Sequence, residues 1–305
     1  MRDGAFSAGG LEVPPHARSG GWRRGAGTNS ARDALEGAIT AIAAAGCETP
    51  RLDAELLLAS VLEVPRERLI TDRDLTVEGP AVRAFQDAVR RRSVQREPVA
   101  YILGRRGFRR LELAVDTRAL IPRPETELLV EMALGLGYGA HVLDVGTGSG
   151  AVALALKDER PDLDVAGSDR SEPALELARS NGRRLALEVR WLRADLLAGV
   201  ADEFDAVIAN LPYVADSERA ALAPEILRHE PADALFAGPD GLAAIRALLA
   251  QLATRRRVGF VALEVGAGQA RAVEEMVRAA GFGAVRSEAD LAGVERVVLG
   301  AERRG

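Results

Sequence analysis

Apolar residues recur at helical spacing over residues 31–95. In ARDALEGAITAIAAAG, Leu35, Ile39 and Ile42 fall on one face of a helix. RLDAELLLASVL repeats the pattern after a proline, and GPAVRAFQDAVRRRSV opens with one, which suits the first turn of a helix. Short amphipathic helices joined by proline-containing turns predict a small helical bundle.

The pattern changes over residues 96–124, which include EPVAYILGRRGFRRLELAVDTRALIPRP. Leu111, Leu113 and Val115 alternate with other residues as in a strand, and the glycines before them permit a hairpin or a bend. The prolines of IPRP exclude a helix until ETELLVEMALGL begins a new helical run. We therefore expect a linker with a β-hairpin between two domains.

From His141 onward, strand-like runs alternate with amphipathic helices. The runs HVLDVG, LDVAGSD, VRWLRAD, FDAVIAN, GFVALEVG and VERVVLG are rich in Val, Ile and Leu. Strands of this kind predict an α/β fold, with a mostly parallel sheet covered by helices on both faces. Ligands of such sheets bind beyond the carboxyl ends of the strands, where the strand order reverses.

Composition narrows the classes of function. The net charge of −5 gives no overall basic field to recruit nucleic acid, and the arginine runs, such as residues 90–92, are typical of solvated surface. One cysteine excludes an internal disulfide, and with three scattered histidines we expect no protein-held metal. No apolar run approaches the roughly 20 residues that a membrane span needs.

The first thirty residues are rich in Gly, Arg and Ser and lack the apolar run of a signal peptide. We expect residues 1–30 to be a disordered extension and the protein to be cytoplasmic.

A glycine-rich turn follows the first strand of the α/β region, in LDVGTGSGAVALAL. Gly146, Gly148 and Gly150 permit a sharp turn and the close approach of a ligand, but their spacing is not that of the dinucleotide fingerprint. Asp144, just before the turn, would repel a pyrophosphate but could bind an ammonium group, directly or through water. By itself the turn fits a cofactor site and a tight packing turn equally well.

The next two strands also end on acidic residues. Asp169 lies about 20 residues past the turn, where it could accept hydrogen bonds from a ribose, and Asp195 could meet an adenine amino group. Each acid alone could instead cap a helix. Together they describe a nucleoside that carries an amino acid, namely S-adenosylmethionine. The predicted cofactor-binding residues are Asp144, Gly146, Thr147, Gly148, Ser149, Gly150, Asp169, Asp195, Leu196 and Asn210.

The fourth strand ends in Asn210-Leu211-Pro212-Tyr213, which resembles the (Asn/Asp/Ser)-Pro-Pro-(Tyr/Phe/Trp) motif of amino-group methyltransferases. A conjugated planar amino group is a poor nucleophile and must be held in line with the methyl group that it attacks. The Asn210 side-chain carbonyl and the next backbone carbonyl can accept its two N–H groups. Pro212 fixes the backbone, and Tyr213 can stack on the flat group. We predict Asn210, Pro212 and Tyr213 as catalytic residues.

Further segments resemble the release factor glutamine methyltransferases, the HemK or PrmC family. They are RLDAELLL, EPVAYILG, LIPRPETELLVE, HEPADALFAGPDGL and LEVGAGQ. The resemblance implies a Rossmann-like class I methyltransferase domain with a seven-stranded sheet over residues 125–305. It also implies that residues 31–95 recognise the substrate and that residues 96–124 link the two domains.

The activity that the resemblance implies is methylation of the side-chain nitrogen N5 of glutamine, in the Gly-Gly-Gln loop of bacterial class 1 release factors. It implies that residues 210–213 (Asn210, Leu211, Pro212 and Tyr213) bind the glutamine. It also makes Arg123, Glu125 and Thr126 candidates for shaping the substrate pocket. For Arg123, a structural salt bridge with a nearby carboxylate is an equally good interpretation.

Leu211 departs from the family motif, which usually has proline there. Asn-Leu-Pro-Tyr also resembles the motif of ribosomal RNA adenine dimethyltransferases, and the motif alone does not separate an adenine amino group from a glutamine amide. The acidic charge balance and the aromatic content of 4% argue against a nucleic-acid substrate. Ribosomal protein glutamine methyltransferases remain open as an alternative. The glycine spacing and the motif after the fourth strand disfavour a nicotinamide-dependent oxidoreductase or a non-catalytic binding module.

Overall fold

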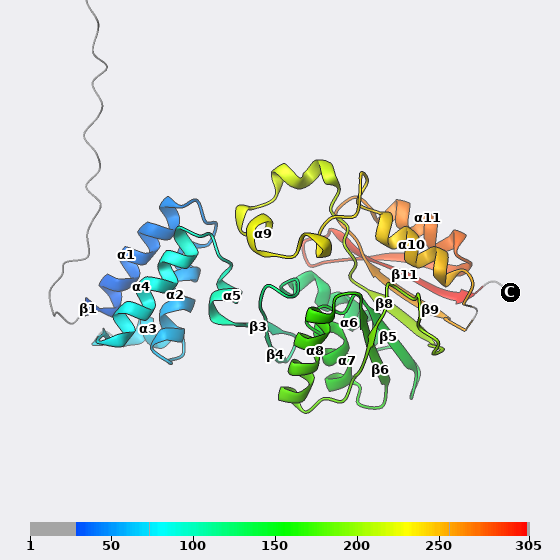
Figure 1. Cartoon of the computed structure of the whole chain (residues 1–305), viewed down its shortest axis with the longest axis horizontal. Helices are drawn as coiled ribbons and strands as arrows, with labels where there is room; N and C mark the ends of the chain where they lie inside the picture. Colours follow the sequence, from blue (N-terminus) through cyan, green and yellow to red (C-terminus); the bar gives the residue numbers. More distant parts are fainter. Residues whose placement is uncertain (1–28, 73, 256, 304–305) are drawn as a thin grey trace, which may run out of the picture.

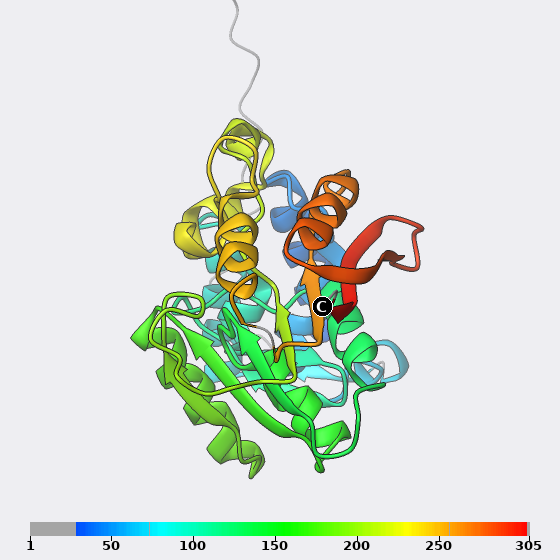
Figure 2. The same cartoon turned by 90° about the vertical axis from the view of Figure 1, so that its right-hand side faces the viewer.

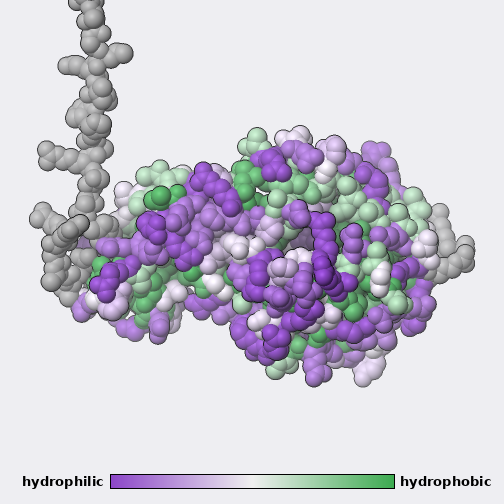
Figure 3. All heavy atoms as spheres, viewed as in Figure 1, coloured by the Kyte–Doolittle hydropathy of each residue, from purple (hydrophilic) through white to green (hydrophobic). Residues whose placement is uncertain are grey.

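The computed structural model describes residues 29–72, 74–255 and 257–303, in a helical part and an α/β part (Figure 1). The extension predicted over residues 1–30 lies outside the described residues, except for its last two. Within the described ranges, no helix combines the length and apolar character that crossing a bilayer requires. The face seen in Figure 3 is mainly hydrophilic, with hydrophobic side chains scattered over it.

The helical part is built on the apolar periodicity of the sequence. Ile42, Leu57 and Phe85, from three different helices, are fully buried in its core. Ser30 caps the first helix through a 3.1 Å hydrogen bond that its Oγ accepts from the Asp33 N–H. The elements are β1 (Asn29–Ser30), α1 (Ala31–Ala44), α2 (Pro50–Val61), α3 (Arg68–Thr71), β2 (Thr76–Val77), α4 (Pro80–Ser93) and α5 (Val99–Leu103), and β1 pairs with β2.

A β-hairpin connects the two parts, as predicted from the alternating pattern. Its strands are β3 (Arg105–Phe108) and β4 (Leu111–Ala114), which pair antiparallel. A 3₁₀ turn, η1 (Pro124–Thr126), then leads into α6 (Glu127–Ala133). The α-helix therefore begins after Pro122 and Pro124, since proline is not tolerated in the interior of an α-helix.

The central sheet has seven strands in the order β10-β11-β9-β8-β5-β6-β7. The five strands β9, β8, β5, β6 and β7 run parallel to one another, and β11 runs antiparallel to β9 and β10. The predicted α/β fold class, with a mostly parallel sheet of seven strands, is confirmed. The strands are β5 (His141–Val145), β6 (Asp164–Asp169), β7 (Arg190–Arg193), β8 (Ala206–Ala209), β9 (Phe260–Glu264), β10 (Phe282–Ala289) and β11 (Glu295–Arg303).

Helices cover both faces of the sheet (Figure 2). Leu143 and Val145 of β5 pack in a core with α10 and α11, whereas Val142 packs in a second core with α6 and α7. Successive side chains of a strand point to opposite faces, so a strand buried on both sides reads as a continuous apolar run. The helices are α7 (Ala151–Glu159), α8 (Glu172–Leu185), α10 (Ala243–Leu252) and α11 (Ala270–Ala279).

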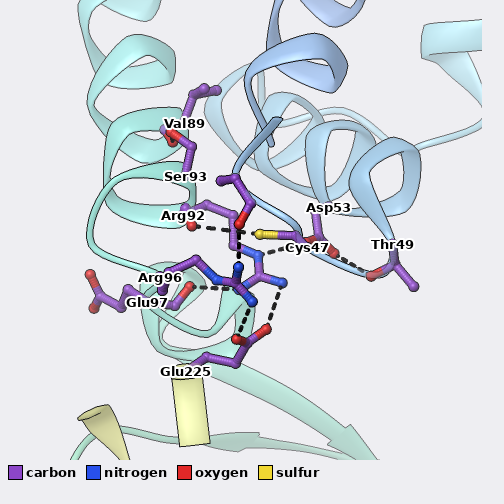
Figure 4. A network of polar contacts seen from close by, with 10 residues as sticks. Cys47, Thr49, Asp53, Val89, Arg92, Ser93, Arg96, Glu97 and Glu225 are labelled. Carbon is purple, nitrogen blue, oxygen red and sulfur yellow. Dashed lines mark hydrogen bonds and ion pairs between the residues drawn. The ribbon is translucent and has the colours of Figure 1, made fainter. Parts of the chain in front are cut away.

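After β8 the chain reaches back to the helical bundle. This segment contains η2 (Asp216–Ala221), α9 (Pro224–His229) and η3 (Ala232–Ala234), and its α9 lies between the two parts in Figure 1. Glu225 of α9 pairs with Arg92 at 3.2 Å and with Arg96 at 2.5 Å (Figure 4). Arg92 also pairs with Asp53 of α2 at 2.6 Å. One acidic residue thus ties α9 to the bundle.

The prediction that the arginine run of residues 90–92 is solvated is wrong for Arg92, which is buried. Its guanidinium is compensated by the two carboxylates of Asp53 and Glu225, and a buried charge requires partners of this kind. Arg90 of the same run is half exposed and pairs with the exposed Asp87, as the prediction expects.

Glu225→Ala is expected to lower the free energy of unfolding by about 1–3 kcal/mol, because the buried Arg92 and the half-buried Arg96 lose a shared carboxylate. Chemical denaturation measures this change. Asp87→Ala is the matched control, since it breaks an exposed ion pair to the same arginine run and should leave stability unchanged. Equal effects of the two substitutions would contradict the bridging role of Glu225.

Candidate active site

A cavity of about 1080 Å³ opens at the carboxyl ends of the central strands. It lies where the strand order reverses, since β5 has β6 on one side and β8 on the other. The predicted residues that line it are Arg123, Thr126, Asp144, Gly146, Thr147, Gly148, Ser149, Asp169, Asp195, Leu196, Asn210, Leu211 and Pro212. Gly150, Glu125 and Tyr213 are not among the residues that line it.

The glycine turn after β5 combines both roles left open by the sequence. Gly146, Gly148 and Gly150 have φ values of +74°, +55° and +85°, a region that favours glycine. Gly146 and Gly148 line the cavity, where a ligand can approach their backbone. A Cβ at Gly150 would lie 2.9 Å from the Trp191 ring and 3.2 Å from Ala178, so this glycine is required for packing.

Gly150→Ala is expected to destabilise the fold by about 2–4 kcal/mol, since left-handed backbone strain adds to overpacking against Trp191. Gly148→Ala is the matched control, because its φ is also positive but its Cβ would meet only Ala119, at 3.8 Å. We expect it to cost about 1–2 kcal/mol, from strain alone. Thermal unfolding of both variants measures the difference, and equal losses would show that packing at Gly150 is unimportant.

Asp144 lies beneath the turn and is almost fully buried. Its Oδ2 accepts hydrogen bonds from the Thr147 hydroxyl at 2.6 Å and from the Ala153 N–H at 3.2 Å. Burial raises the pKa of Asp144 to about 7, and these two hydrogen bonds oppose the rise. A cationic group bound in the cavity would favour the ionised carboxylate.

Asp169 and Asp195 lie at the next two strand ends, as predicted. Asp169 Oδ2 accepts from the Gly148 N–H at 3.0 Å, and Oδ1 accepts from the Ser171 N–H at 2.9 Å. A carboxylate oxygen can accept more than one hydrogen bond, so Asp169 keeps capacity for ligand hydroxyls. Asp195 is exposed and lines the cavity.

The arginines that line the cavity are already ion-paired. Arg118 pairs with Asp116 at 2.7 Å, Arg123 with Glu230 at 2.5 Å and Arg170 with Asp233 at 3.2 Å. An unneutralised phosphate cradle is therefore absent from the described lining, whereas carboxylates stand at three strand ends. Together with the two glycines that leave room at the turn, this donor set fits S-adenosylmethionine, a nucleoside with an ammonium group and no phosphate. In the described ranges, no group of three or more His, Cys, Asp or Glu side chains is placed to hold a metal ion.

Asn210 follows β8 directly and reaches the cavity. Its Nδ2 donates a 3.0 Å hydrogen bond to Thr126 Oγ1, which leaves Oδ1 as the atom that can accept from a ligand. Leu211 packs in the hydrophobic core and also lines the cavity.

Tyr213, whose ring was predicted to stack on the substrate amide, does not line the cavity. Its hydroxyl donates a hydrogen bond to Glu264 Oε1 at 3.2 Å. Its backbone carbonyl accepts a hydrogen bond from Gln269 Nε2 at 2.9 Å. Burial raises the pKa of Tyr213, as does the neighbouring Glu264 carboxylate, so its hydroxyl stays protonated. These contacts hold the turn after Asn210.

Arg123 forms the structural salt bridge that was one of its two interpretations. Its partner Glu230 is buried and also accepts from the Ile121 N–H at 3.1 Å, so the segment before η1 is held against the segment after α9. Glu125 is half-buried, and its charge acts on Glu264.

Three residues that support the site were not predicted from the sequence, namely Glu230, Glu264 and Gln269. All three lie in stretches that resemble the family, HEPADALFAGPDGL and LEVGAGQ. Glu264 carries the same signal as the predicted acids, because it is the last residue of a buried strand. Glu230 and Gln269 lie in loops, where one sequence offers no comparable signal.

A seven-stranded, mostly parallel sheet with this turn and these strand-end acids defines a class I S-adenosylmethionine-dependent methyltransferase. Residues 33–104 match the family model of the PrmC N-terminal domain, and residues 124–239 match that of the methyltransferase small domain. The release factor glutamine methyltransferase of Rhodospirillum rubrum is 41% identical over 264 residues, which cover 85% of this chain and 81% of that protein. The chain belongs to the release factor glutamine methyltransferase family.

A second relative agrees with the family assignment, and a solved structure agrees with the fold. The release factor glutamine methyltransferase of Mycolicibacterium smegmatis is 42% identical over 275 residues, covering 88% of this chain and 96% of that protein. Among solved structures, the hMettl16 catalytic domain in complex with an RNA hairpin is similar with a TM-score of 0.51 and 15% identity, over 72% of this chain and 81% of that chain. At that identity the similarity shows the fold alone.

Proposed function

We propose that the protein transfers a methyl group from S-adenosylmethionine to N5 of the glutamine in the Gly-Gly-Gln motif of bacterial class 1 release factors, and so tunes translation termination. The observation that carries the proposal is the Asn210 side chain at the cavity, whose Nδ2 is tied to Thr126 and whose Oδ1 can accept an amide N–H. Membership of the family supports glutamine as the substrate.

When bound, S-adenosylmethionine supplies an electrophilic methyl group on a sulfonium. Asn210 Oδ1 accepts one N–H of the glutamine amide, and the backbone carbonyl of Leu211 accepts the other. These two acceptors hold the nitrogen and increase its electron density as it attacks. Pro212 restricts the backbone of the residue before it, so the Leu211 carbonyl is held in place. The surplus amide proton leaves to water.

For the cofactor, we propose that Asp169 binds the ribose hydroxyls and Asp195 the adenine amino group. The turn from Gly146 to Gly150, with Thr147 and Ser149, approaches the amino-acid part, and Asp144 beneath it offers the compensating negative charge. Leu196 and Asn210 complete the lining. The support is that all of these except Gly150 line one cavity.

For the partner, we propose that the helical bundle of residues 31–95 recognises the release factor and that residues 96–124 link it to the catalytic domain of residues 125–305. The match of residues 33–104 to the PrmC N-terminal domain supports this division. Because release factors act on ribosomes, we place the reaction in the cytoplasm.

Incubation with tritiated S-adenosylmethionine tests the proposed function. We expect label on a purified class 1 release factor and none on the same factor with alanine in place of the Gly-Gly-Gln glutamine. Ribosomal RNA and ribosomal proteins should stay unlabelled in parallel reactions. Label on either of these, with an unlabelled release factor, would contradict the proposal and support one of the alternatives that Leu211 leaves open.

A further inference from the structure

Glu264 is a buried carboxylate next to the proposed methyl-transfer site, and the reaction as proposed gives it no role. It is the last residue of β9, the strand beside β8, and its side chain is 1% exposed. Oε1 accepts the hydrogen bond from the Tyr213 hydroxyl, whereas Oε2 is buried with no hydrogen-bond partner in the described part of the chain. A buried carboxylate costs stability, so its retention calls for another reason.

Thr126 connects Glu264 to Asn210. Thr126 is buried, and its Oγ1 accepts the hydrogen bond from Asn210 Nδ2. Its hydroxyl also lowers the pKa of the neighbouring Glu264 carboxyl, whose Oε2 is free to accept a hydrogen bond. A hydroxyl has one proton to donate, and an ionised carboxylate can only accept. A Thr126 hydroxyl that turns its proton toward the ionised Glu264 presents its lone pair to Asn210. The Asn210 amide then turns Nδ2 to Thr126, which is the orientation of the 3.0 Å hydrogen bond.

We propose that Glu264 is a positioning residue that sets the direction of this hydrogen-bond chain, so that the Asn210 amide presents Oδ1, and not Nδ2, to the substrate amide. The inference rests on the proposed function. The same carboxylate holds the Tyr213 hydroxyl, and so braces both ends of the Asn210–Tyr213 turn. With the amide reversed, Nδ2 would face the N–H groups of the substrate, and two donors would oppose each other.

The hydrogen bonds from Glu264 through Thr126 to Asn210 should respond to pH. A protonated Glu264 can donate to Thr126, and the Asn210 amide is then no longer held in one orientation. Burial raises the pKa of Glu264 to about 7, and the charge of Glu125 in η1 adds to the rise. Thr126, Tyr213 and Arg296 of β11 lower the pKa and so oppose the rise. The ionised form is the ordered one. Turnover at saturating substrate and cofactor is therefore expected to increase as the pH rises through about 7.

Three variants of the full-length protein test these hydrogen bonds, with a release factor as substrate. Glu264→Gln removes the acceptor-only group, and Thr126→Val removes the hydroxyl without changing side-chain shape. We expect each to lower kcat on the order of 10- to 100-fold, by analogy with residues that orient the ligands of a metal, and to leave the Kd for S-adenosylmethionine within about twofold. Thr126→Ser keeps the hydroxyl and should restore kcat to within about threefold of wild type.

Two readouts separate positioning from a structural role. The rise of kcat through about pH 7 should be absent in Glu264→Gln. Because the pKa of Glu264 is raised in the folded protein, its ionisation disfavours folding as the pH rises through about 7, so Glu264→Gln should melt at pH 8 no lower than wild type. A structural role would instead lower the melting temperature and leave the shape of the pH profile unchanged.

The proposal is overturned if wild type methylates the release factor and Glu264→Gln keeps its kcat and pH profile, or if Thr126→Val is as active as Thr126→Ser. If wild type itself forms no methylglutamine, it is the proposed function that fails. The Kd for S-adenosylmethionine, measured by calorimetry for each variant, shows that the compared proteins are folded and bind cofactor.

Discussion

Asn210→Ala is expected to lower kcat for release factor methylation about 100-fold or more, the size of loss seen when an enzyme loses a preorganised hydrogen-bond partner of the transition state. The substitution removes Oδ1, which accepts one N–H of the glutamine amide, and leaves Thr126 without its donor. Steady-state kinetics at saturating cofactor measure the change. Cofactor binding should be weakened but still measurable, because Asn210 is one of many lining residues.

The second proposed acceptor, the backbone carbonyl of Leu211, is not removed by the Asn210 substitution. The remaining activity should therefore report a singly held amide. Glutamine methylation at the wild-type rate by Asn210→Ala would show that the side chain does not hold the amide, and the mechanism proposed for Asn210-Leu211-Pro212-Tyr213 would be wrong.

Asp169→Ala is expected to act on the cofactor instead, raising the Kd for S-adenosylmethionine on the order of 10- to 100-fold. Hydrogen bonds to a charged group contribute about 1.5–3 kcal/mol each, and a factor of ten corresponds to about 1.4 kcal/mol. Ribose contacts are the same in the ground state and the transition state, so kcat at saturating cofactor should change little. Calorimetric titration measures the Kd.

Asp169→Asn is the matched control for that loss. It keeps one carbonyl oxygen that can accept from the Gly148 N–H, so the glycine turn stays supported while the negative charge is removed. We expect a Kd between those of wild type and Asp169→Ala. A decrease in kcat with an unchanged Kd for either variant would place Asp169 outside the cofactor site.

The strand-end acids and the glycine turn were predictable because parallel strands bring their carboxyl ends to one edge of the sheet. Asp144, Asp169 and Asp195 are far apart in the sequence, yet each follows or ends an apolar run, and the structure places all three at one cavity. The position of each is set by local periodicity, which a single sequence displays.

The partners of these residues could not be predicted in the same way. Asn210 meets Thr126 across 84 positions of sequence and Tyr213 meets Glu264 across 51, and no local pattern encodes such pairings. The buried Arg92 is a similar case, since its carboxylate partners lie 39 and 133 positions away. Such contacts depend on how the elements pack.

One strand of the central sheet also escapes prediction by periodicity. β10 (Phe282–Ala289) is one of the two edge strands of this sheet, and its sequence FGAVRSEA mixes polar and apolar residues with few buried positions. An edge strand pairs on one side only, so it needs less apolar surface than the central strands. Its pairing with β11 becomes evident only in the folded sheet.

Mass spectrometry of class 1 release factors from cells that lack this protein tests the central claim most directly. The glutamine of the Gly-Gly-Gln peptide is expected to be unmethylated in those cells and methylated again when the wild-type protein, but not Asn210→Ala, is supplied. A peptide that stays fully methylated without the protein would contradict the account.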